Sequence, residues 1–248
     1  MTLEQFFAEN REVAVAFSGG VDSAYLLYAA TRYAARVKAY YVSTAFQPEF
    51  ELEDARRLAA DVGADMQVLH VDVLMSGAVV ANPSDRCYHC KNTLFRQILR
   101  AAENDGFPVL LDGTNASDDA GDRPGMRALR ELSVRSPLRE CGLTKAEIRR
   151  LSREAGLFTW DKPAYACLAT RIRTGEEITL QKLKQTEKAE GFLFGLGFRD
   201  FRVRMVDNTA KLELREADLP LLLENREKIV TELRKDYDSV LLNLEARK

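Results

Sequence analysis

The chain has 248 residues, of which 46% are hydrophobic and 30% are charged, and its formal net charge is −2. This composition is typical of a soluble protein with a substantial core, and the length suits a main domain with a smaller appendage. The chain has no apolar run of membrane-spanning length, and its first residues lack the basic and apolar regions of a signal peptide. These features argue against a membrane or secreted protein, and we expect a cytoplasmic one.

Strand-like and helix-like segments alternate over residues 1–165, which is the pattern of a parallel α/β sheet. The expected strands are residues 13–17, 37–42, 67–71 and 109–111. The expected helices are residues 22–35, 51–62, 92–104 and 144–155, the last opened by a capping box of Thr144 and Glu147. Crossovers in such a sheet place the ligand at the carboxyl edge of the strands. Three segments that follow strands should therefore converge there, namely residues 18–23, 43–48 and 112–115.

The pattern changes near residue 165, and residues 166–248 are expected to form a smaller α+β module. Its expected elements are a helix at residues 180–193, a β-hairpin of residues 201–206 and 210–214, helices within 217–233 and a strand at 239–244. The chain contains no internal repeat, low-complexity tract or flexible linker. We therefore predict two domains, residues 1–165 and 166–248.

The most informative motif is SGGVDS at residues 18–23, between an expected strand and an expected helix. Such a turn directs backbone N–H groups and the positive end of a helix at one point, which suits a phosphate group. Gly19 and Gly20 lack the Cβ atoms that would keep phosphate oxygens away, and Ser18 and Ser23 add hydroxyl donors. Asp22 is placed to hold Mg²⁺ or a helix N-terminal amide. The alternative is an ordinary strand-to-helix turn.

A second polar segment, DGTN at residues 112–115, also follows a strand. Gly113 and Thr114 are candidate contacts for the ribose or the α-phosphate of a nucleotide, and Ser43 should lie at the same edge. The loop after this segment carries Asp118, Asp119 and Arg123. These residues are candidates for Mg²⁺ ligation and for a phosphate contact by Arg123, and the alternative is a solvated loop.

Four cysteines in a chain of this kind indicate metal, cluster or thiol chemistry, or buried small residues, rather than a disulfide framework. Cys87 and Cys90 form a CxxC motif just before a helix, which suits zinc, redox or cluster sites without specifying one. Cys141 is expected to be a buried bystander. Cys167 lies between a lysine and an arginine, which would favour its nucleophilic thiolate.

Two arginines, Arg202 and Arg204, alternate along an expected strand and should share one face. Paired guanidinium groups suit a phosphate or a carboxylate, and we place them with Arg171 in a predicted substrate site. The alternative for the strand is an exposed basic surface.

Several of these segments together resemble the LarE family of PP-loop ATP pyrophosphatases. The resemblance rests on SGGVDS, RCYHCK at residues 86–91, DGTNASDDAGDRPG at 112–125, KPAYACLATR at 162–171 and FRVR at 201–204. It covers about residues 13–214, and the segments after SGGVDS are the more specific ones. The resemblance implies a doubly wound parallel sheet of the adenine nucleotide alpha hydrolase type, carrying a smaller module.

The family is an ATP-dependent sulfur transferase that helps to build the nickel-pincer nucleotide cofactor of lactate racemase. The resemblance therefore implies that ATP, with Mg²⁺, adenylates a carboxylate of pyridinium-3,5-biscarboxylic acid mononucleotide, and that sulfur then displaces AMP. Residues 18–23 would stabilise the leaving pyrophosphate, and Arg202 and Arg204 match positions thought to hold the substrate phosphate. The resemblance also implies a homo-oligomer. The lack of a long apolar run and the net charge of −2 argue against a membrane or nucleic-acid partner.

The sulfur source is open between two branches of the family. In one branch the cysteine that matches Cys167 gives up its own sulfur and becomes dehydroalanine. In the other, three cysteines hold an iron–sulfur cluster whose free iron carries an extra sulfide. This chain has Cys87, Cys90 and Cys167, which fits three-cysteine ligation, so we favour a 4Fe–4S cluster.

Three other functions remain open from the sequence. A tRNA thiolase would need a basic surface, which the net charge of −2 does not suggest. An ammonia-using ligase of the NAD- or GMP-synthetase kind would need no cysteine. A regulatory module would bind ATP without releasing pyrophosphate.

Overall fold

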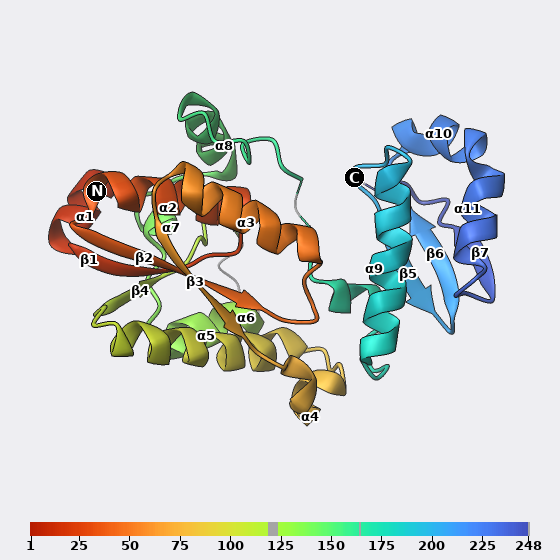
Figure 1. Ribbon diagram of the computed structural model, residues 1–248, viewed down its shortest axis with the longest axis horizontal. Coiled ribbons are helices and arrows are strands. Elements are labelled where there is room, and N and C mark those ends of the chain that lie inside the picture. Colours follow the sequence, from red (N-terminus) through yellow and green to blue (C-terminus); the bar gives the residue numbers. More distant parts are fainter. Residues whose placement is uncertain (119–123, 164, 248) are drawn as a thin grey trace. The chain divides into compact units, whose positions relative to one another are not determined.

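The computed structural model describes residues 1–118, 124–163 and 165–247. The chain divides into two compact units, one of Met1–Val73 with Asp85–Ala164 and one of Leu74–Ser84 with Tyr165–Lys248. The described residues include no helix that is both long and apolar enough to cross a bilayer. Each unit has its own sheet and its own apolar core (Figure 1).

The first unit is built on a parallel sheet with the strand order β3-β2-β1-β4. The strands are β1 (Glu12–Ala16), β2 (Arg36–Ser43), β3 (Asp65–His70) and β4 (Val109–Leu111). β1 pairs with both β2 and β4, Val13 lying opposite Val37 on one side and Val109 on the other. The loops after β2, β1 and β4 therefore leave from neighbouring positions on one edge of the sheet.

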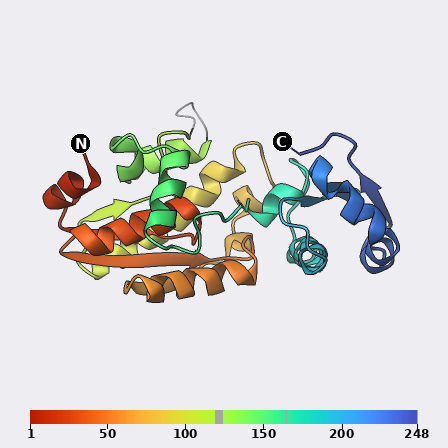
Figure 2. The same cartoon turned by 90° about the horizontal axis from the view of Figure 1, so that it is seen from above.

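Helices cover both faces of this sheet because alternate residues of β1 are apolar and buried in opposite directions. Val13 and Val15 join the core beneath α1 (Leu3–Glu9), α2 (Val21–Tyr33), α3 (Glu49–Asp61) and α8 (Lys145–Glu154). Ala14 joins a second core beneath α5 (Arg86–Asn104), which lies on the other side of the sheet (Figures 1 and 2). The expected doubly wound α/β fold is confirmed.

Most of the expected elements are present, with small shifts at their ends. The capping box of Thr144 and Glu147 opens α8 as expected. The expected helix at residues 92–104 is wrong at its start, because α5 begins at Arg86 and includes the CxxC motif in its first turns. The sequence analysis did not find the short helices α1, α4 (Gly77–Val80), α6 (Pro124–Glu131) and α7 (Pro137–Glu140), or the 3-10 turn η1 (Val73–Met75).

The second unit has a three-stranded sheet in the order β5-β6-β7, formed by β5 (Arg202–Val206), β6 (Thr209–Glu213) and β7 (Ser239–Leu242). β5 and β6 form the expected hairpin, whose turn residues Asp207 and Asn208 have φ of 45° and 59°. β7 pairs in parallel with β6. Helix α9 (Leu180–Gly195) packs on this sheet, followed by η3 (Glu216–Asp218), α10 (Leu219–Glu224) and α11 (Arg226–Leu233).

Residues 74–84 group with the second unit, although they precede α5 in the chain. The backbone explains this grouping. Gly175 N–H donates to Asn82 O at 2.8 Å, and Ile178 N–H donates to Val80 O at 2.9 Å. The Asn82 amide also donates to Arg173 O at 2.8 Å. No sequence pattern had indicated this pairing, because it joins segments about ninety residues apart.

Candidate active site

The loop of residues 18–23 connects β1 to α2 and has the backbone that its two glycines predict. Gly19 has φ of +73°, which strains any residue with a side chain. A Cβ on Gly19 would lie 3.3 Å from Ala55 Cβ and 3.4 Å from Glu51 O, because the loop packs against α3. Gly20 is the N-cap of α2 and has no side chain to occupy the helix end. The first N–H groups of α2 therefore remain available to an anion.

The two serines of this loop bond to each other across it. Ser18 Oγ and Ser23 Oγ are 3.0 Å apart, and Ser18 N–H donates to Ser23 Oγ at 3.3 Å. The Ser23 hydroxyl also donates to Gly20 O at 3.2 Å, and the Ser23 residue is buried. These contacts join the two ends of the loop. A phosphate contact by either hydroxyl stays a prediction.

The DGTN segment lies directly against the loop of residues 18–23. A Cβ on Gly113 would come within 2.8 Å of Ser23 N, so only glycine allows this approach. Asp112 is buried and accepts hydrogen bonds from the hydroxyls of Thr114 and Ser136. Because the Thr114 hydroxyl is engaged with Asp112, its clearest role is to hold the segment in place. The predicted convergence of these two segments is confirmed.

Asp22, in the first turn of α2, is the candidate Mg²⁺ ligand. Its Oδ2 accepts a hydrogen bond from Lys145 Nζ at 2.6 Å, whereas its Oδ1 is buried and has no hydrogen-bond partner among the described residues. Burial raises the pKa of the Asp22 carboxyl, and the hydrogen bond from Lys145 opposes that rise. A buried carboxylate oxygen without a partner fits a hard cation. Mg²⁺ is usually held by one or two carboxylates together with substrate phosphates.

Replacing Asp22 with asparagine should separate ligand binding from stability. A carboxyl whose pKa is raised by folding ionises less readily in the folded than in the unfolded chain, so its charge costs stability at neutral pH. We therefore expect Asp22→Asn to leave the melting temperature of the ligand-free protein unchanged or higher. Loss of a metal ligand should weaken MgATP binding by more than about 10-fold. Thermal melts with and without MgATP measure both effects, and an equal loss of stability in both would contradict the assignment.

Two lysines complete the charge around this loop, and the sequence analysis had assigned neither. Lys145 is the first residue of α8 and contacts Asp22. Lys162 lies beyond α8, and its ammonium group is 2.6 Å from Asp54 Oδ2 and 3.5 Å from Gly19 O. Lys162 opens the KPAYACLATR segment on which the family resemblance rests, but its spacing gave the side chain no role. These side chains supply the positive charge that the SGGVDS motif itself lacks.

The remaining nucleotide-site predictions have different outcomes. Ser43 ends β2, and its carbonyl accepts from Val71 N–H at 3.0 Å. Asp118 Oδ2 accepts from Asn115 N–H at 2.9 Å, which orders the loop after the DGTN segment. Arg123 and Asp119 lie outside the described residues. Nucleotide contacts by these residues therefore stay predictions.

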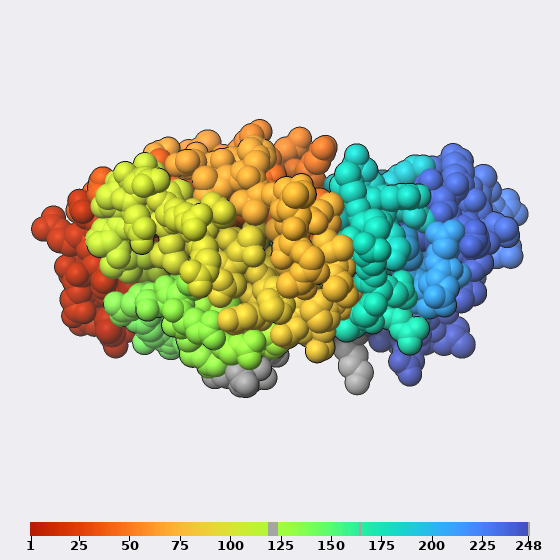
Figure 3. All heavy atoms as spheres, turned by 90° about the horizontal axis from the view of Figure 1, so that it is seen from below, coloured from red at the N-terminus to blue at the C-terminus, as the bar shows by residue number. Residues whose placement is uncertain are grey.

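The CxxC motif lies in the first turns of α5, at the carboxyl edge of β3, and not in a loop before a helix as expected. Cys87 is exposed and Cys90 is half-buried. The Arg86 guanidinium contacts Cys87 Sγ at 3.8 Å. Helix α6 supports these turns, because Gly125 packs closely against the Lys91 side chain. Figure 3 shows α5, in yellow, across this face of the first unit.

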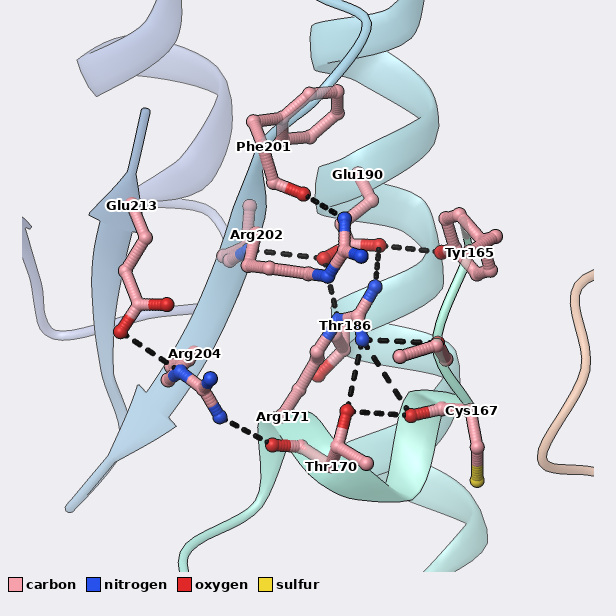
Figure 4. A network of polar contacts seen from close by, with 12 residues as sticks. Tyr165, Cys167, Thr170, Arg171, Thr186, Glu190, Phe201, Arg202, Arg204 and Glu213 are labelled. Carbon is pink, nitrogen blue, oxygen red and sulfur yellow. Dashed lines mark hydrogen bonds and ion pairs between the residues drawn. The ribbon is translucent and has the colours of Figure 1, made fainter. Parts of the chain in front are cut away.

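Cys167 lies in the second unit, at the N-cap of the 3-10 turn η2 (Leu168–Arg171). A fully buried ion pair holds the residues around it (Figure 4). Arg171 donates to both oxygens of Glu190, through Nε at 2.8 Å and Nη2 at 3.0 Å. Its Nη1 donates to Ala166 O at 2.9 Å and to Cys167 O at 3.5 Å. The backbone on both sides of the thiol is thereby fixed.

Glu190 is a residue that the sequence analysis missed. Besides Arg171, it accepts hydrogen bonds from the Tyr165 hydroxyl and from Val203 N–H on β5. Burial alone would lower the pKa of the Arg171 guanidinium, but the hydrogen bond and charge of Glu190 raise it above its ordinary value. Arg171 is 1% exposed, so its described contacts give it a positioning role. Direct substrate binding by Arg171 stays a prediction.

Arg202 and Arg204 lie on β5 and face the η2 segment (Figure 4). Arg204 donates to Thr170 O at 2.7 Å and to Glu213 Oε1 at 2.8 Å. Burial, together with the charges of Arg171 and Arg247, lowers the pKa of the Arg202 guanidinium. Cations that lie close together in a partly buried site favour the binding of an anion. The shared face predicted for the two arginines fits this arrangement.

Within the described residues, no group of three or more histidine, cysteine or acidic side chains could hold a metal ion. Cys87 and Cys90 belong to the first unit, and Cys167 belongs to the second. Two cysteines three residues apart on one helix supply two thiolate ligands on one side, which is the donor type that iron–sulfur clusters use. A cluster ligated by all three cysteines stays a prediction.

A parallel sheet with a glycine-rich phosphate loop after β1 and a close DGTN segment defines a PP-loop nucleotide-binding enzyme. Residues 4–117 match the model of the asparagine synthase family. The chain is 33% identical over 218 residues to the pyridinium-3,5-bisthiocarboxylic acid mononucleotide synthase of Lactiplantibacillus plantarum, covering 87% of this chain and 79% of that protein. It belongs to the LarE family of ATP-dependent sulfur transferases.

Two further relatives match over a similar length and have uncharacterised functions. A protein of Synechocystis sp. is 39% identical over 215 residues, covering 86% of this chain and 80% of the relative. A protein of Methanocaldococcus jannaschii is 30% identical over 239 residues, covering 96% of this chain and 91% of the relative. The similarity thus extends through both units.

Proposed function

We propose that the chain uses ATP to convert a carboxylate of pyridinium-3,5-biscarboxylic acid mononucleotide into a thiocarboxylate. The observation that carries this proposal is the fixed Cys167 loop beside Arg202 and Arg204, in a chain whose other unit has a complete phosphate loop. The name of the Lactiplantibacillus plantarum relative supports the choice of substrate. A carboxylate-bearing mononucleotide supplies the anionic groups that two arginines would bind.

The first step is attack of a substrate carboxylate oxygen on the α-phosphorus of ATP. A new P–O bond gives the acyl-adenylate, and the bond to the β-phosphate breaks to release pyrophosphate. The N–H groups at the start of α2 face the place where charge develops on the leaving group. Asp22, whose Oδ1 accepts no hydrogen bond from the part of the chain that the structure describes, would hold Mg²⁺ with the phosphates, and Mg²⁺ would neutralise that charge.

The second step is attack of sulfur on the acyl carbon, which breaks the C–O bond to AMP. Two sources remain for this sulfur. A 4Fe–4S cluster held by Cys87, Cys90 and Cys167 would supply a bound sulfide. Alternatively, the Cys167 thiolate attacks directly and forms a thioester. Loss of its Cα proton and cleavage of the Cβ–S bond then leave dehydroalanine and the thiocarboxylate. We favour the cluster because the chain has all three cysteines.

Iron and acid-labile sulfide, measured on protein purified without oxygen, distinguish the two sources. A cluster should give about four irons per chain, lost in Cys87→Ala, Cys90→Ala and Cys167→Ala. Cys141→Ala is the matched control, because burial raises the pKa of the Cys141 thiol and disfavours its thiolate. Iron content should therefore be unchanged in that variant. Absence of iron after reconstitution, with loss of H₂S from Cys167 after one turnover, would establish the sacrificial source instead.

The adenylation itself is tested by pyrophosphate release. We expect release to require both ATP and the pyridinium mononucleotide, and to persist in Cys167→Ala, because that variant lacks only the second step. Full sulfur transfer by Cys167→Ala would contradict the proposal. Full activity of Cys167→Ala with ammonia, giving an amide, would favour an ammonia-using ligase. ATP binding without pyrophosphate release in the presence of the substrate would favour a regulatory module.

A further inference from the structure

The phosphate loop has a deficit of positive charge that its own sequence does not fill. Residues 18–23 contain no lysine or arginine, although they would receive the triphosphate of ATP. Backbone N–H groups and a helix end provide only partial charges. A cation from another segment must therefore reach the loop if it is to stabilise pyrophosphate as a leaving group.

Lys162 is placed to supply that cation. Its ammonium group is 3.5 Å from Gly19 O, so it is already in contact with the backbone of the phosphate loop. Its closer partner is Asp54 Oδ2 at 2.6 Å, from a turn of α3 that packs against the same loop. The side chain of Lys162 is 15% exposed and that of Asp54 is 33% exposed. A partly solvated ion pair of this kind is weak enough to be exchanged for a phosphate.

Hydrogen bonds fix the backbone of Lys162, whereas its side chain is a flexible stem of four carbons. Arg149 Nη2 donates to Lys162 O at 2.9 Å, and Arg149 Nη1 donates to Trp160 O at 2.7 Å. Lys162 N–H donates to Thr159 O at 3.1 Å. The ammonium group can therefore move between Asp54 and the loop without a change in the fold. A lysine is suited to this, because it is a compact charge on a flexible stem.

We propose that Lys162 binds the β- and γ-phosphates of ATP, and then the released pyrophosphate, by leaving its resting partner Asp54. The assignment deepens the proposed adenylation and rests on it. Asp54 acts as a competitor for the ammonium group rather than as a ligand. This residue pair thus sets how tightly the enzyme holds its leaving group.

Calorimetric binding of MgATP and magnesium pyrophosphate to the full-length protein tests the assignment. Lys162→Met should weaken both by about 10-fold or more, because it removes a charge-assisted hydrogen bond. AMP, which lacks the β- and γ-phosphates, should bind equally well to both proteins. Asp54→Asn should tighten pyrophosphate binding or leave it unchanged, since it releases Lys162. If the Lys162–Asp54 ion pair had only a structural role, both substitutions would weaken pyrophosphate binding.

Lys38→Met is a closely matched control. The Lys38 ammonium group is also 2.6 Å from a carboxylate, Asp105, and its side chain is 18% exposed. It lies on β2 at the opposite edge of the same sheet from the phosphate loop. We expect the Lys38→Met variant to bind pyrophosphate with wild-type affinity.

Three outcomes overturn the assignment. They are wild-type pyrophosphate affinity in Lys162→Met, weaker pyrophosphate binding in Asp54→Asn, and a loss of AMP binding in Lys162→Met equal to its loss of pyrophosphate binding. Failure of the wild-type protein to bind MgATP would instead refute the proposed function.

Discussion

Replacing Glu190 with alanine is expected to destabilise the second unit by about 3–5 kcal/mol, the usual cost of leaving one partner of a buried ion pair without the other. Arg171 and Glu190 are 1% exposed, so no water can replace the lost carboxylate. The Tyr165 hydroxyl and Val203 N–H would lose their acceptor as well. Sulfur transfer should be lost because the Cys167 loop loses its anchor. Urea unfolding followed by circular dichroism measures the stability.

The position of the Cys167 loop needs a separate measurement from stability. The rate of Cys167 alkylation, followed by mass spectrometry of its peptide, should rise in Glu190→Ala. The double variant Glu190→Ala/Arg171→Met should be less destabilised than the sum of its single variants, because it leaves no buried charge uncompensated. Glu232→Ala removes a half-buried carboxylate from its pair with the exposed Lys235 side chain and should change little. Wild-type stability and thiol reactivity in Glu190→Ala would contradict the role of this pair.

Replacing Gly113 with alanine is expected to separate the two nucleotide segments. The added Cβ would lie 2.8 Å from Ser23 N and 3.1 Å from Ser23 Cα, so the backbone at the start of α2 must shift. Overpacking of this kind costs about 1–3 kcal/mol of stability. It also moves the N–H groups at the start of α2, which we propose bind the phosphates. We expect ATP affinity to fall by at least about 10-fold, which corresponds to about 1.4 kcal/mol.

Gly191→Ala is the control for the same chemical change. Gly191 lies within α9, and a Cβ there would meet no atom within 4 Å. Alanine favours a helix interior over glycine by about 1 kcal/mol, so this variant should be as stable as the wild type or more so. Nucleotide binding should not change. Normal ATP affinity in Gly113→Ala would show that the segments are less closely coupled than their contact indicates.

The sequence predicted the fold of the first unit well because its signals are local. Short apolar runs gave the strands, and a capping box gave the start of α8. It predicted α5 poorly at its start, since RCYHCK is polar and lacks apolar periodicity, yet these residues form its first turns. The helix begins there because α6 packs against them through Gly125 and Arg127.

The candidate site was predicted where the motif itself carries the chemistry. The glycines of SGGVDS and DGTN were found because only glycine permits a positive φ at Gly19 and a close backbone approach at Gly113. The thiol of Cys167 was found from its charged neighbours in the sequence. What the sequence by itself determined, therefore, was the glycine-rich turn of residues 18–23 and the parallel strands around it, together with the residues that we propose to react.

Only the tertiary structure decided which charged side chains lie next to those residues. Lys145 and Lys162 reach the phosphate loop from positions more than 100 residues away in the chain. Glu190 comes from the middle of α9 to bind Arg171, and this buried pair holds the backbone at Ala166 and Cys167. Long-range ion pairs leave no periodic trace in a sequence. They depend on burial and on distances of a few ångströms, which the packing of helices on each sheet sets.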